Sequence, residues 1–236
     1  KVTPNKAFYL NSKNLTRDTF YLDDHESHHL TQVLRTDLSE KIYLLDGAGK
    51  GYVGQITSIE NKIVYGKIIN TIIGLGENTF NLNIVPALTK GQRFESLIEK
   101  VTELGIKEIH PIITNRCIKK SLNMNRCKKI IKASAKQCNR SFFPKLLEPV
   151  EFKMWLKNAK GKNLVGMQKS ENRLSGLRIN KGENINILIG PEGDFNNDEH
   201  KLLKDRDAEF YTLSDRRLRS DTAAQATISI LNELLT

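Results

Sequence analysis

The first segment with the residue types for chemistry is a glycine-containing turn after an apolar strand. Residues 187–195 read ILIGPEGDF, and a predicted helix follows, capped by Asn196 with Glu199 three residues on. Glycines let main-chain N–H and C=O groups approach a ligand such as an adenine or a carboxylate. The turn lacks the GxGxxG motif of dinucleotide-binding sites. It also lacks the lysine of a P-loop, so a nucleoside-triphosphate site is disfavoured as well. A tight connection without a ligand is the alternative.

A second candidate segment is rich in arginine. Residues 213–224 read LSDRRLRSDTAA, so Arg216, Arg217 and Arg219 surround one leucine before a Ser/Asp/Thr cluster opens the last predicted helix. Guanidinium groups bind phosphate, or stabilise negative charge that forms on a substrate during a reaction. An exposed helix N-terminus also favours an anion nearby. A solvated basic loop would have the same composition, but arginine at this density beside a helix cap favours a functional site.

The third candidate is a helix predicted over residues 125–140 with cations on one face. Lys129, Lys132 and Lys136 recur at i, i+3 and i+7, and Arg126 and Arg140 stand near the ends. Such a stripe is typical of a phosphate-backbone contact, although an ordinary solvated helix also carries one. The whole chain has 37 Lys plus Arg against 27 Asp plus Glu, a net charge of +10. This balance indicates a polyanionic partner such as RNA, unless a lysine-rich composition alone explains it.

Other site classes find little support in the sequence. The three cysteines form no CxxC pair, which argues against a zinc knuckle, and the cluster of His25, His28 and His29 has no matching carboxylates, so we expect no metal. No GxSxG motif is present. No apolar run approaches the ~18 residues of a membrane span, and the first residues lack the apolar core of a signal peptide. We therefore expect neither a membrane protein nor an exported one.

The elements that position these segments fall into two groups. Over residues 1–72 short strands are predicted around one helix, which suggests a small barrel: strands 7–10, 41–45, 52–59 and 62–69, and a helix over 24–34. Residues 72–78, IIGLGEN, have the composition of a linker. We therefore predict one domain over 1–72 and a second over 73–236.

In the second domain strands and helices alternate, which predicts an α/β domain with a mainly parallel sheet. The predicted strands are 82–85, 109–113, 164–167, 185–189 and 210–213, and the predicted helices are 94–104, 125–139, 197–204 and 222–235. Both candidate loops follow predicted strands, and the carboxyl ends of parallel strands are where such sheets bind ligands.

Taken together, these segments resemble the 16S ribosomal RNA uridine N3-methyltransferases of the knotted SPOUT superfamily. The matching segments span nearly the whole chain in a specific order: HLTQVLR at 29–35, ALTKG at 87–91, KVTELG at 100–105, NRC at 115–117, QCNR at 137–140, LIGPEG at 188–193 and the arginine-rich loop at 213–223. The resemblance implies an N-terminal PUA-like β-barrel that binds RNA and a C-terminal α/β domain with a deep trefoil knot, a topology that general rules would disfavour. It also implies a cytoplasmic homodimer that uses S-adenosylmethionine on small-subunit 16S ribosomal RNA.

The resemblance also assigns residues to roles. The methyl donor is expected on residues of the two loops, mostly through main-chain groups: Ile189, Gly190, Glu192, Gly193, Leu213, Leu218, Arg219, Ser220, Thr222 and Ala223. The basic helix and the basic positions of the matching motifs give the RNA-binding candidates: Arg35, Lys90, Lys129, Lys132, Lys136, Arg140 and Arg216. The chain departs from the family pattern at Asp194, where a glycine is usual, at Ser214-Asp215 and at Asp221, where a glutamate is usual.

Methylation of uridine N3 needs an aligned sulfonium, a base taken out of its stack and loss of the N3 proton. We expect Arg219 to stabilise the uracil anion electrostatically. Asp221 is the candidate base or orienting group, although an ordinary aspartate pKa near 3.9 suits this proton poorly. Positioning of donor and acceptor would then contribute more than proton transfer. The alternatives are a knotted methyltransferase for another RNA and a catalytically silent RNA-binding protein.

Overall fold

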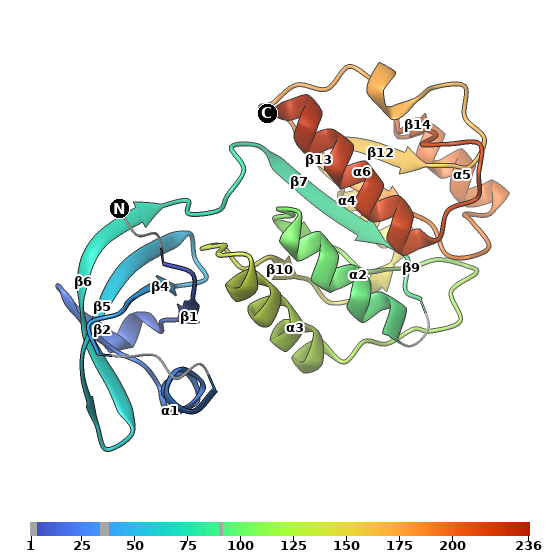
Figure 1. Ribbon diagram of the computed structural model, residues 1–236. Coiled ribbons are helices and arrows are strands. Elements are labelled where there is room, and N and C mark those ends of the chain that lie inside the picture. Colours follow the sequence, from blue (N-terminus) through green and yellow to red (C-terminus); the bar gives the residue numbers. More distant parts are fainter. Residues whose placement is uncertain (1–3, 34–37, 90–91) are drawn as a thin grey trace. The chain divides into compact units, whose positions relative to one another are not determined.

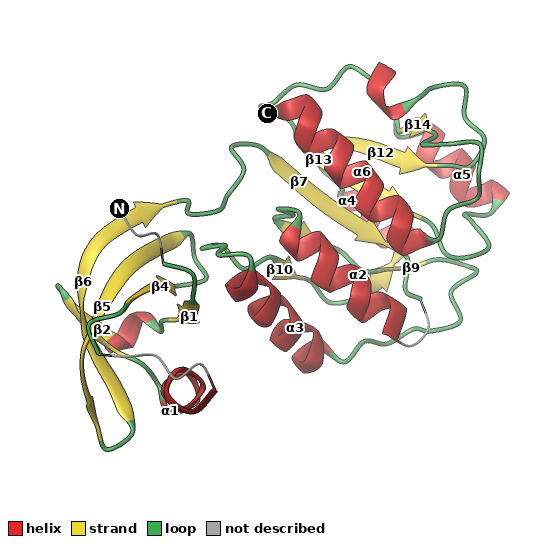
Figure 2. Cartoon of the chain, in the orientation of Figure 1, coloured by secondary structure: helices red, strands yellow, loops and turns green. Residues whose placement is uncertain are grey.

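The computed structural model describes residues 4–33, 38–89 and 92–236, and the chain divides into two compact units (Figures 1 and 2). The first unit comprises residues 1–77 with 132–143, and the second comprises 78–131 with 144–236. The helix α3 (Met124–Gln137) therefore contributes residues to both units. The domain boundary expected after residue 72 falls one residue before the end of strand β6, which ends at Ile73.

The first unit is a curled six-stranded sheet in the order β1-β4-β5-β6-β3-β2, in which β1 pairs in parallel with β4 and the other pairs are antiparallel. Its strands are β1 (Ala7–Tyr9), β2 (Leu15–Thr16), β3 (Thr19–Tyr21), β4 (Lys41–Leu45), β5 (Lys50–Glu60) and β6 (Ile63–Ile73). Register shifts in β5 between Val53 and Gly54 and between Ile56 and Ser58 add the local twist that curls the sheet.

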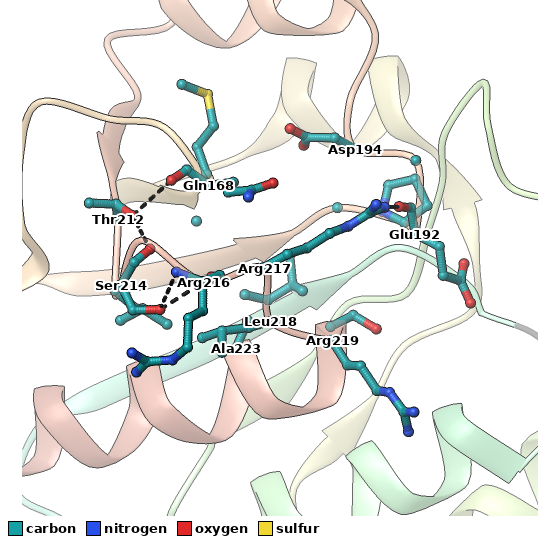
Figure 3. Close-up of a pocket in the computed structure, with 18 of the residues that line it drawn as sticks. Gln168, Glu192, Asp194, Thr212, Ser214, Arg216, Arg217, Leu218, Arg219 and Ala223 are labelled. Atoms are coloured by element: carbon teal, nitrogen blue, oxygen red, sulfur yellow. Dashed lines mark hydrogen bonds between the residues drawn. The ribbon is translucent and has the colours of Figure 1, made fainter.

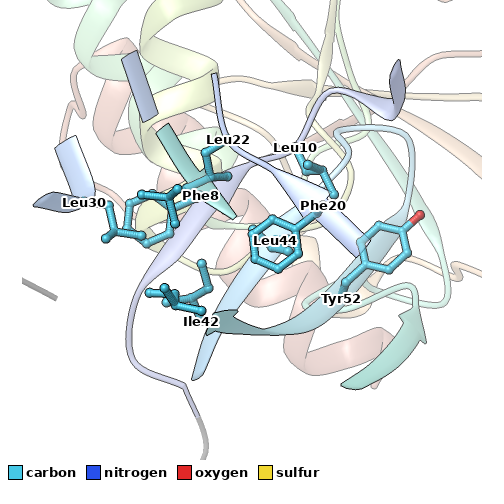
Figure 4. Packing of buried hydrophobic residues seen from close by; sticks show 10 residues of the cluster. Phe8, Leu10, Phe20, Leu22, Leu30, Ile42, Leu44 and Tyr52 are labelled. Carbon is cyan, nitrogen blue, oxygen red and sulfur yellow. The ribbon is translucent and has the colours of Figure 1, made fainter. Parts of the chain in front are cut away.

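The core of this unit lies inside the curl (Figure 4). Its buried side chains are spread along the sequence from residue 8 to residue 64: Phe8, Leu10, Phe20, Leu22, Leu30, Ile42, Leu44, Tyr52, Ile56 and Val64. Gly54 and Gly66 are required beside Phe20, because a Cβ on either residue would come within 2.7 Å or 2.4 Å of the Phe20 ring. The small barrel of strands that the sequence suggested is present as a curled sheet of the PUA-like kind, and the helical residue Leu30 joins its core.

The single helix predicted over 24–34 changes its pitch after His28, and its last residue lies outside the described residues. The α-helix α1 (Asp24–His28) is capped by Asp23, whose Oδ1 accepts a hydrogen bond from the Glu26 N–H at 2.8 Å. The chain continues as a π-helical turn, η2 (His29–Val33). One short 3-10 turn, η1 (Ser12–Asn14), precedes β2.

The second unit is built on a parallel six-stranded sheet in the order β10-β8-β7-β13-β12-β14. Its strands are β7 (Asn81–Pro86), β8 (Glu108–Ile109), β10 (Lys145–Leu146), β12 (Lys162–Gly166), β13 (Asn184–Ile189) and β14 (Glu209–Tyr211), and β9 (Ile112–Ile113) pairs separately with β11 (Val150–Glu151). The remaining helices are α2 (Gln92–Glu103), α4 (Phe152–Asn158), α5 (Asn197–Lys204) and α6 (Ser220–Leu235), with a 3-10 turn η3 (Leu174–Gly176). The α/β prediction with a parallel sheet is confirmed, and α2 and α6 pack side by side (Figure 1).

The strand predicted over 109–113 is in fact two strands. Pro111 separates β8 from β9, and because proline has no N–H it cannot continue the hydrogen-bond ladder of one strand. The two halves pair with different partners, β8 within the main sheet and β9 with β11. Among the described residues, no helix is long and apolar enough to cross a membrane.

Candidate functional site

A cavity of about 540 Å³ lies at the carboxyl ends of β12, β13 and β14 in the second unit (Figure 3). Three chain segments line it, with one side chain from α2: Arg93, 166–168, 189–194, 211–214, 216–220 and Ala223. Its volume falls in the range of small-molecule sites, and its position is the one where parallel sheets bind ligands.

The first wall is the turn after β13, from Gly190 to Asp194. A Cβ at Gly190 would stand 3.1 Å from Asp194 Oδ1 and 3.3 Å from the Phe195 ring, so a larger residue here would have to push these side chains aside and the turn favours glycine. Asp194 adopts a left-handed conformation with φ of 63°, and its Oδ1 accepts a hydrogen bond from the Phe195 N–H at 2.7 Å. Aspartate tolerates this conformation better than most residues, so Asp194 suits a position where the resemblance led us to expect glycine.

One buried carboxylate fixes both the end of this turn and a neighbouring loop. Glu199 is 4% exposed and forms the predicted capping box of α5 with Asn196, with its Oε2 accepting from the Asn196 N–H at 2.9 Å. Its other oxygen, Oε1, accepts from the Asn115 N–H at 2.8 Å. Glu199 therefore ties the loop that contains Asn115 and Arg116 to the end of the turn.

Three arginines hold the turn from outside the sheet. Arg116 donates to the main-chain oxygen of Gly193, and Arg217 Nη2 donates to the main-chain oxygen of Glu192 at 2.6 Å. Arg93 pairs with the Glu192 carboxylate at 2.9 Å. These bonds pre-order the turn before any ligand arrives.

The second wall is the arginine-rich loop between β14 and α6. Ser214 forms a local turn, because its hydroxyl accepts from the Arg216 N–H at 3.2 Å. Arg219 is the N-cap residue of α6 and has an extended backbone, with no side-chain cap bond. In Figure 3 the Arg217 side chain runs toward Glu192, whereas the Arg219 side chain points away from Gln168 and Thr212.

The third wall is a segment that the sequence reasoning missed. Gly166 is the last residue of β12, and Met167 and Gln168 follow it. The Met167 N–H donates to the Tyr211 main-chain oxygen at 2.9 Å. The Thr212 hydroxyl lies 3.1 Å from the Gln168 main-chain oxygen and binds it (Figure 3). The only signal in the sequence was the glycine at the end of the strand predicted over 164–167.

Tyr211 lines the cavity but belongs to its framework. The side chain is fully buried, and its hydroxyl shares a hydrogen bond of 2.7 Å with Thr227 Oγ1. Burial raises the pKa of Tyr211 far above its ordinary value, so the phenol stays protonated. Its hydroxyl also lies 3.1 Å from where a Cβ on Gly166 would stand, which favours glycine at that position.

The expected donor-binding residues gather at this cavity with one exception. Those that line it are Ile189, Gly190, Glu192, Gly193, Leu213, Leu218, Arg219, Ser220 and Ala223. Thr222 is exposed on α6 and does not line it, and neither does Asp221. The Asp221 Oδ1 accepts from the Thr222 N–H at 3.0 Å, so this carboxylate sits on the first turn of its own helix.

The expected RNA-binding residues divide into those that are exposed and those that are not. Arg216 is exposed and lines the cavity, and Lys129 is exposed on α3. Lys132 Nζ lies 3.8 Å from the centre of the Tyr9 ring and 3.5 Å from Glu26 Oε1. Arg35 and Lys90 lie outside the described residues.

The remaining two expected RNA contacts are engaged within the first unit: the Lys136 side chain is only 13% exposed, and Arg140 is buried. Lys136 Nζ lies 2.8 Å and 2.9 Å from the two carboxylate oxygens of the fully buried Glu26. Arg140 is 2% exposed and binds Glu77 through Nε at 3.1 Å and Nη2 at 2.8 Å. The expectation of a solvent-facing stripe is therefore corrected at Lys136 and Arg140, because buried carboxylates far away in the sequence hold both cations.

Comparisons with known proteins agree with this architecture. Residues 76–232 match the RNA methyltransferase domain family, and residues 22–69 match the RNA methyltransferase PUA domain family. Ribosomal RNA small subunit methyltransferase E of Rickettsia conorii is 28% identical over 94% of this chain and 92% of its own length. Among the described residues, no group of three or more His, Cys, Asp or Glu side chains could hold a metal ion.

Two solved structures resemble the whole fold. Ribosomal RNA small subunit methyltransferase E of Neisseria gonorrhoeae, bound to S-adenosyl methionine, aligns with a TM-score of 0.88 and 27% identity over 97% of both chains. A methyltransferase of Legionella pneumophila in complex with the same cofactor aligns with a TM-score of 0.86 and 26% identity, over 99% of this chain and 98% of its own. With a cavity at the expected sheet edge and a domain match over most of its length, the chain belongs to the RNA methyltransferase family.

Proposed function

We propose that this enzyme transfers a methyl group from S-adenosylmethionine to N3 of a uridine in small-subunit ribosomal RNA. The observation that carries the proposal is the cavity in which the Gly-Pro-Glu-Gly turn faces the arginine-rich loop. The name of the Rickettsia relative supports the choice of RNA, and the ligand in the Neisseria and Legionella structures supports the choice of donor. The choice of N3 rests on the family resemblance of the motifs.

The residues present fit this donor. Ile189, Leu213 and Leu218 give the cavity apolar walls for an adenine, and the surrounding turns supply main-chain polar groups. Guanidinium groups at the rim, Arg93 and Arg217 among them, suit a ligand with a carboxylate. When bound, S-adenosylmethionine supplies an activated methyl group on its sulfonium.

The contribution of the chain is mainly placement and charge. Arg219 begins α6 at the cavity, and we assign it the stabilisation of negative charge on the uracil oxygens as N3 loses its proton. Its exposed side chain is free to turn toward an incoming base. Asp221 acts as an orienting group on the first turn of α6 rather than as the base, since its carboxylate is outside the cavity lining.

The larger assembly forms the next part of the proposal. The first unit acts as the RNA-binding PUA-like domain and the second as the catalytic domain, with Arg216 and Lys129 holding the flanking RNA. The family resemblance supports a homodimer, a trefoil knot in the second domain, and work in the cytoplasm, where small subunits are assembled. Size-exclusion chromatography with light scattering measures the oligomeric state directly.

The decisive experiment supplies methyl-labelled S-adenosylmethionine and small ribosomal subunits from a strain that lacks the modification. Digestion to nucleosides should place the label in N3-methyluridine. Label in another nucleoside would point to a different RNA target, and failure to bind the donor at all would favour a silent RNA-binding protein.

Site variants then test the assigned roles. Arg219→Ala should lower kcat by about 10²–10³-fold while donor affinity stays near that of the unchanged protein. The exposed Arg178→Ala, outside the cavity, is the matched control. Asp221→Asn should lower kcat less than about tenfold, and a loss as large as that of Arg219→Ala would restore Asp221 as the base.

A further inference from the structure

A second cavity of about 730 Å³ lies beside the donor cavity in the second unit and shares Met167 with it. Its lining combines cations, amides and an aromatic ring: Met167, Lys169, Ser170, Glu171, Asn172, Asn197, His200, Lys201, Lys204 and Phe210. The methyl-transfer chemistry above assigns no role to this lining apart from Met167. A cavity that adjoins the donor site is accessible to whatever lies next to the nucleotide being modified.

One wall of the second cavity is a single face of α5. Asn197, His200, Lys201 and Lys204 recur at i, i+3, i+4 and i+7, so their side chains lie along one side of this helix. Leu203, on another side of α5, is fully buried and anchors the helix to the unit. The packing of Leu203 therefore holds α5 in place with its polar face at the cavity.

The other wall is the segment after β12, which is fixed along β14. The Ser170 hydroxyl donates to the Phe210 main-chain oxygen at 3.0 Å and accepts from the Asn172 N–H at 3.3 Å. The Thr212 N–H donates to the Asn172 main-chain oxygen at 2.9 Å. Since this wall is already ordered, ligand binding there costs little conformational entropy.

The charge and the rings of this lining match a strand of nucleic acid. Lys169, Lys201 and Lys204 outnumber the single carboxylate, Glu171, and among the described residues none of the three lysines has a carboxylate within ion-pair distance. Unpaired lysines around a concave surface are suited to phosphate. The rings of His200 and Phe210 lie 5.8 Å apart between their centres and offer apolar surface on which a base can stack.

We propose that this second cavity binds the phosphodiester and base of a nucleotide adjacent to the methylated one, an inference that rests on the proposed function. Lys169, Lys201 and Lys204 would contact phosphate, and Phe210 with His200 would contact the base. The shared Met167 places the neighbouring nucleotide next to the donor cavity. This subsite would hold the strand in register while the target base leaves its stack.

The test reverses charge on the α5 face and compares it with a matched pair elsewhere. Lys201→Glu with Lys204→Glu is set against Lys153→Glu with Lys157→Glu, two exposed lysines on α4 that line neither cavity. Affinity for small-subunit ribosomal RNA is measured by filter binding over a salt series, and donor affinity by calorimetry. The α5 pair should weaken RNA binding by about tenfold or more and reduce the salt slope by about one to two units, with donor affinity unchanged.

A second variant covers the possibility that charge reversal disturbs α5. Lys201→Gln with Lys204→Gln keeps similar side-chain length and helix propensity, and it should produce the same direction of change. RNA carrying 4-thiouridine beside the target should also cross-link to peptide 197–204. Equal RNA affinity and salt slope in the α5 and α4 pairs, or cross-links that avoid α5, would overturn the subsite.

The outcomes also separate this inference from the proposed function. If the unchanged protein methylates no ribosomal uridine yet the α5 variants lose RNA affinity selectively, the proposed function fails, and the second cavity remains an RNA-binding site without its assigned place beside a methylated nucleotide. If the unchanged protein does methylate and the α5 variants equal the control, only the subsite fails.

Discussion

The two units of this protein use positive charge in opposite ways. In the first unit the side chains of Lys136 and Arg140 are 13% and 2% exposed and pair with buried Glu26 and Glu77. In the second unit Arg216, Arg217 and Arg219 are exposed around the donor cavity. The position of the opposite charge, rather than the spacing of the cations, distinguishes a framework cation from one that meets a ligand.

This difference has an energetic basis. A buried ion pair is expensive to break, because the remaining charge stays without water or a partner. An exposed cation on a loop adds little to stability and is available for binding. Substitutions in the two regions should therefore separate stability from function.

The largest effect is expected at the Arg140–Glu77 pair. Arg140→Ala leaves the buried Glu77 carboxylate without its guanidinium, and we expect the free energy of unfolding of the first unit to fall by about 3–5 kcal/mol. Arg216→Ala, at an exposed position of the second unit, should change the free energy of unfolding of that unit by less than about 0.5 kcal/mol. Urea unfolding followed by circular dichroism measures the loss of unfolding free energy in both variants. Equal losses would contradict the distinction between framework cations and exposed cations.

A smaller effect is expected at Glu199, a buried carboxylate that binds main-chain N–H groups instead of a cation. Glu199→Ala leaves the Asn115 N–H without its partner and removes half of the α5 capping box, so the second unit should lose about 1–3 kcal/mol. Donor affinity should fall with it, because Arg116 adjoins Asn115 and holds the turn at Gly193. The fluorescence of Trp155, the only tryptophan, monitors this unit during unfolding.

The matched control for Glu199→Ala is the exposed neighbour Asp198→Ala, which keeps the capping box. This control should leave donor affinity unchanged. If both variants bind the donor equally well, Glu199 stabilises α5 only and has no part in shaping the site.

The stability of the first unit should depend on pH through His29. Burial lowers the pKa of His29 from 6.5, nearby Lys136 adds to this, and Glu26 opposes it. Among the residues that the structure describes, the Nδ1 atom of His29 finds no hydrogen-bond partner. The unfolded chain therefore takes up a proton first as pH falls. We expect stability to be constant above about pH 6.5 and to decrease as pH drops below it toward the lowered pKa.

His29→Gln should remove part of this slope, as read from the urea midpoint between pH 8 and pH 5. His25→Gln is the control, since the His25 side chain is 83% exposed. An identical slope in both variants would show that His29 is not the group responsible.

The smallest effect is expected when Asp194 is replaced by glycine. Asp194→Gly removes the cost of a left-handed residue and loses the bond to the Phe195 N–H, so stability should change by less than about 1 kcal/mol. Asp194→Val should cost roughly 1–2 kcal/mol or more, because a β-branched residue resists φ of 63°. Calorimetry with the donor shows whether the turn keeps its shape, and a tolerated valine would mean that the turn is not tightly constrained.

Local signals predicted much of this fold. The bounds of α5 match the prediction because Asn196 and Glu199 form the capping box that the sequence suggested. Gly105, with φ of 93°, follows the end of α2 as expected. In contrast, α4 and the two-residue strands β10 and β11 were missed, since segments this short show no periodic pattern.

The parts of the site that the sequence did not predict depend on contacts between distant parts of the chain. The two loops were found from glycine and arginine, but the wall at 166–168 depends on the pairing of β12 with β14, about which residue types say nothing. The cations of α3 were misjudged for the same reason. Glu26 lies 110 residues from Lys136, and Glu77 lies 63 residues from Arg140.

The three-walled cavity links the supply of methyl donor to the melting of the catalytic unit. Its walls come from the ends of β12, β13 and β14 and the start of α6, so the unfolded chain has no donor site. A ligand that binds only the folded form, at a hundred times its dissociation constant, adds about 2.7 kcal/mol to the free energy of unfolding. Titrating S-adenosylmethionine should therefore raise the melting temperature of the second unit and leave the melting temperature of the first unit unchanged. A cell that runs short of the donor would lose activity twice, through empty sites and through a larger unfolded fraction of the enzyme.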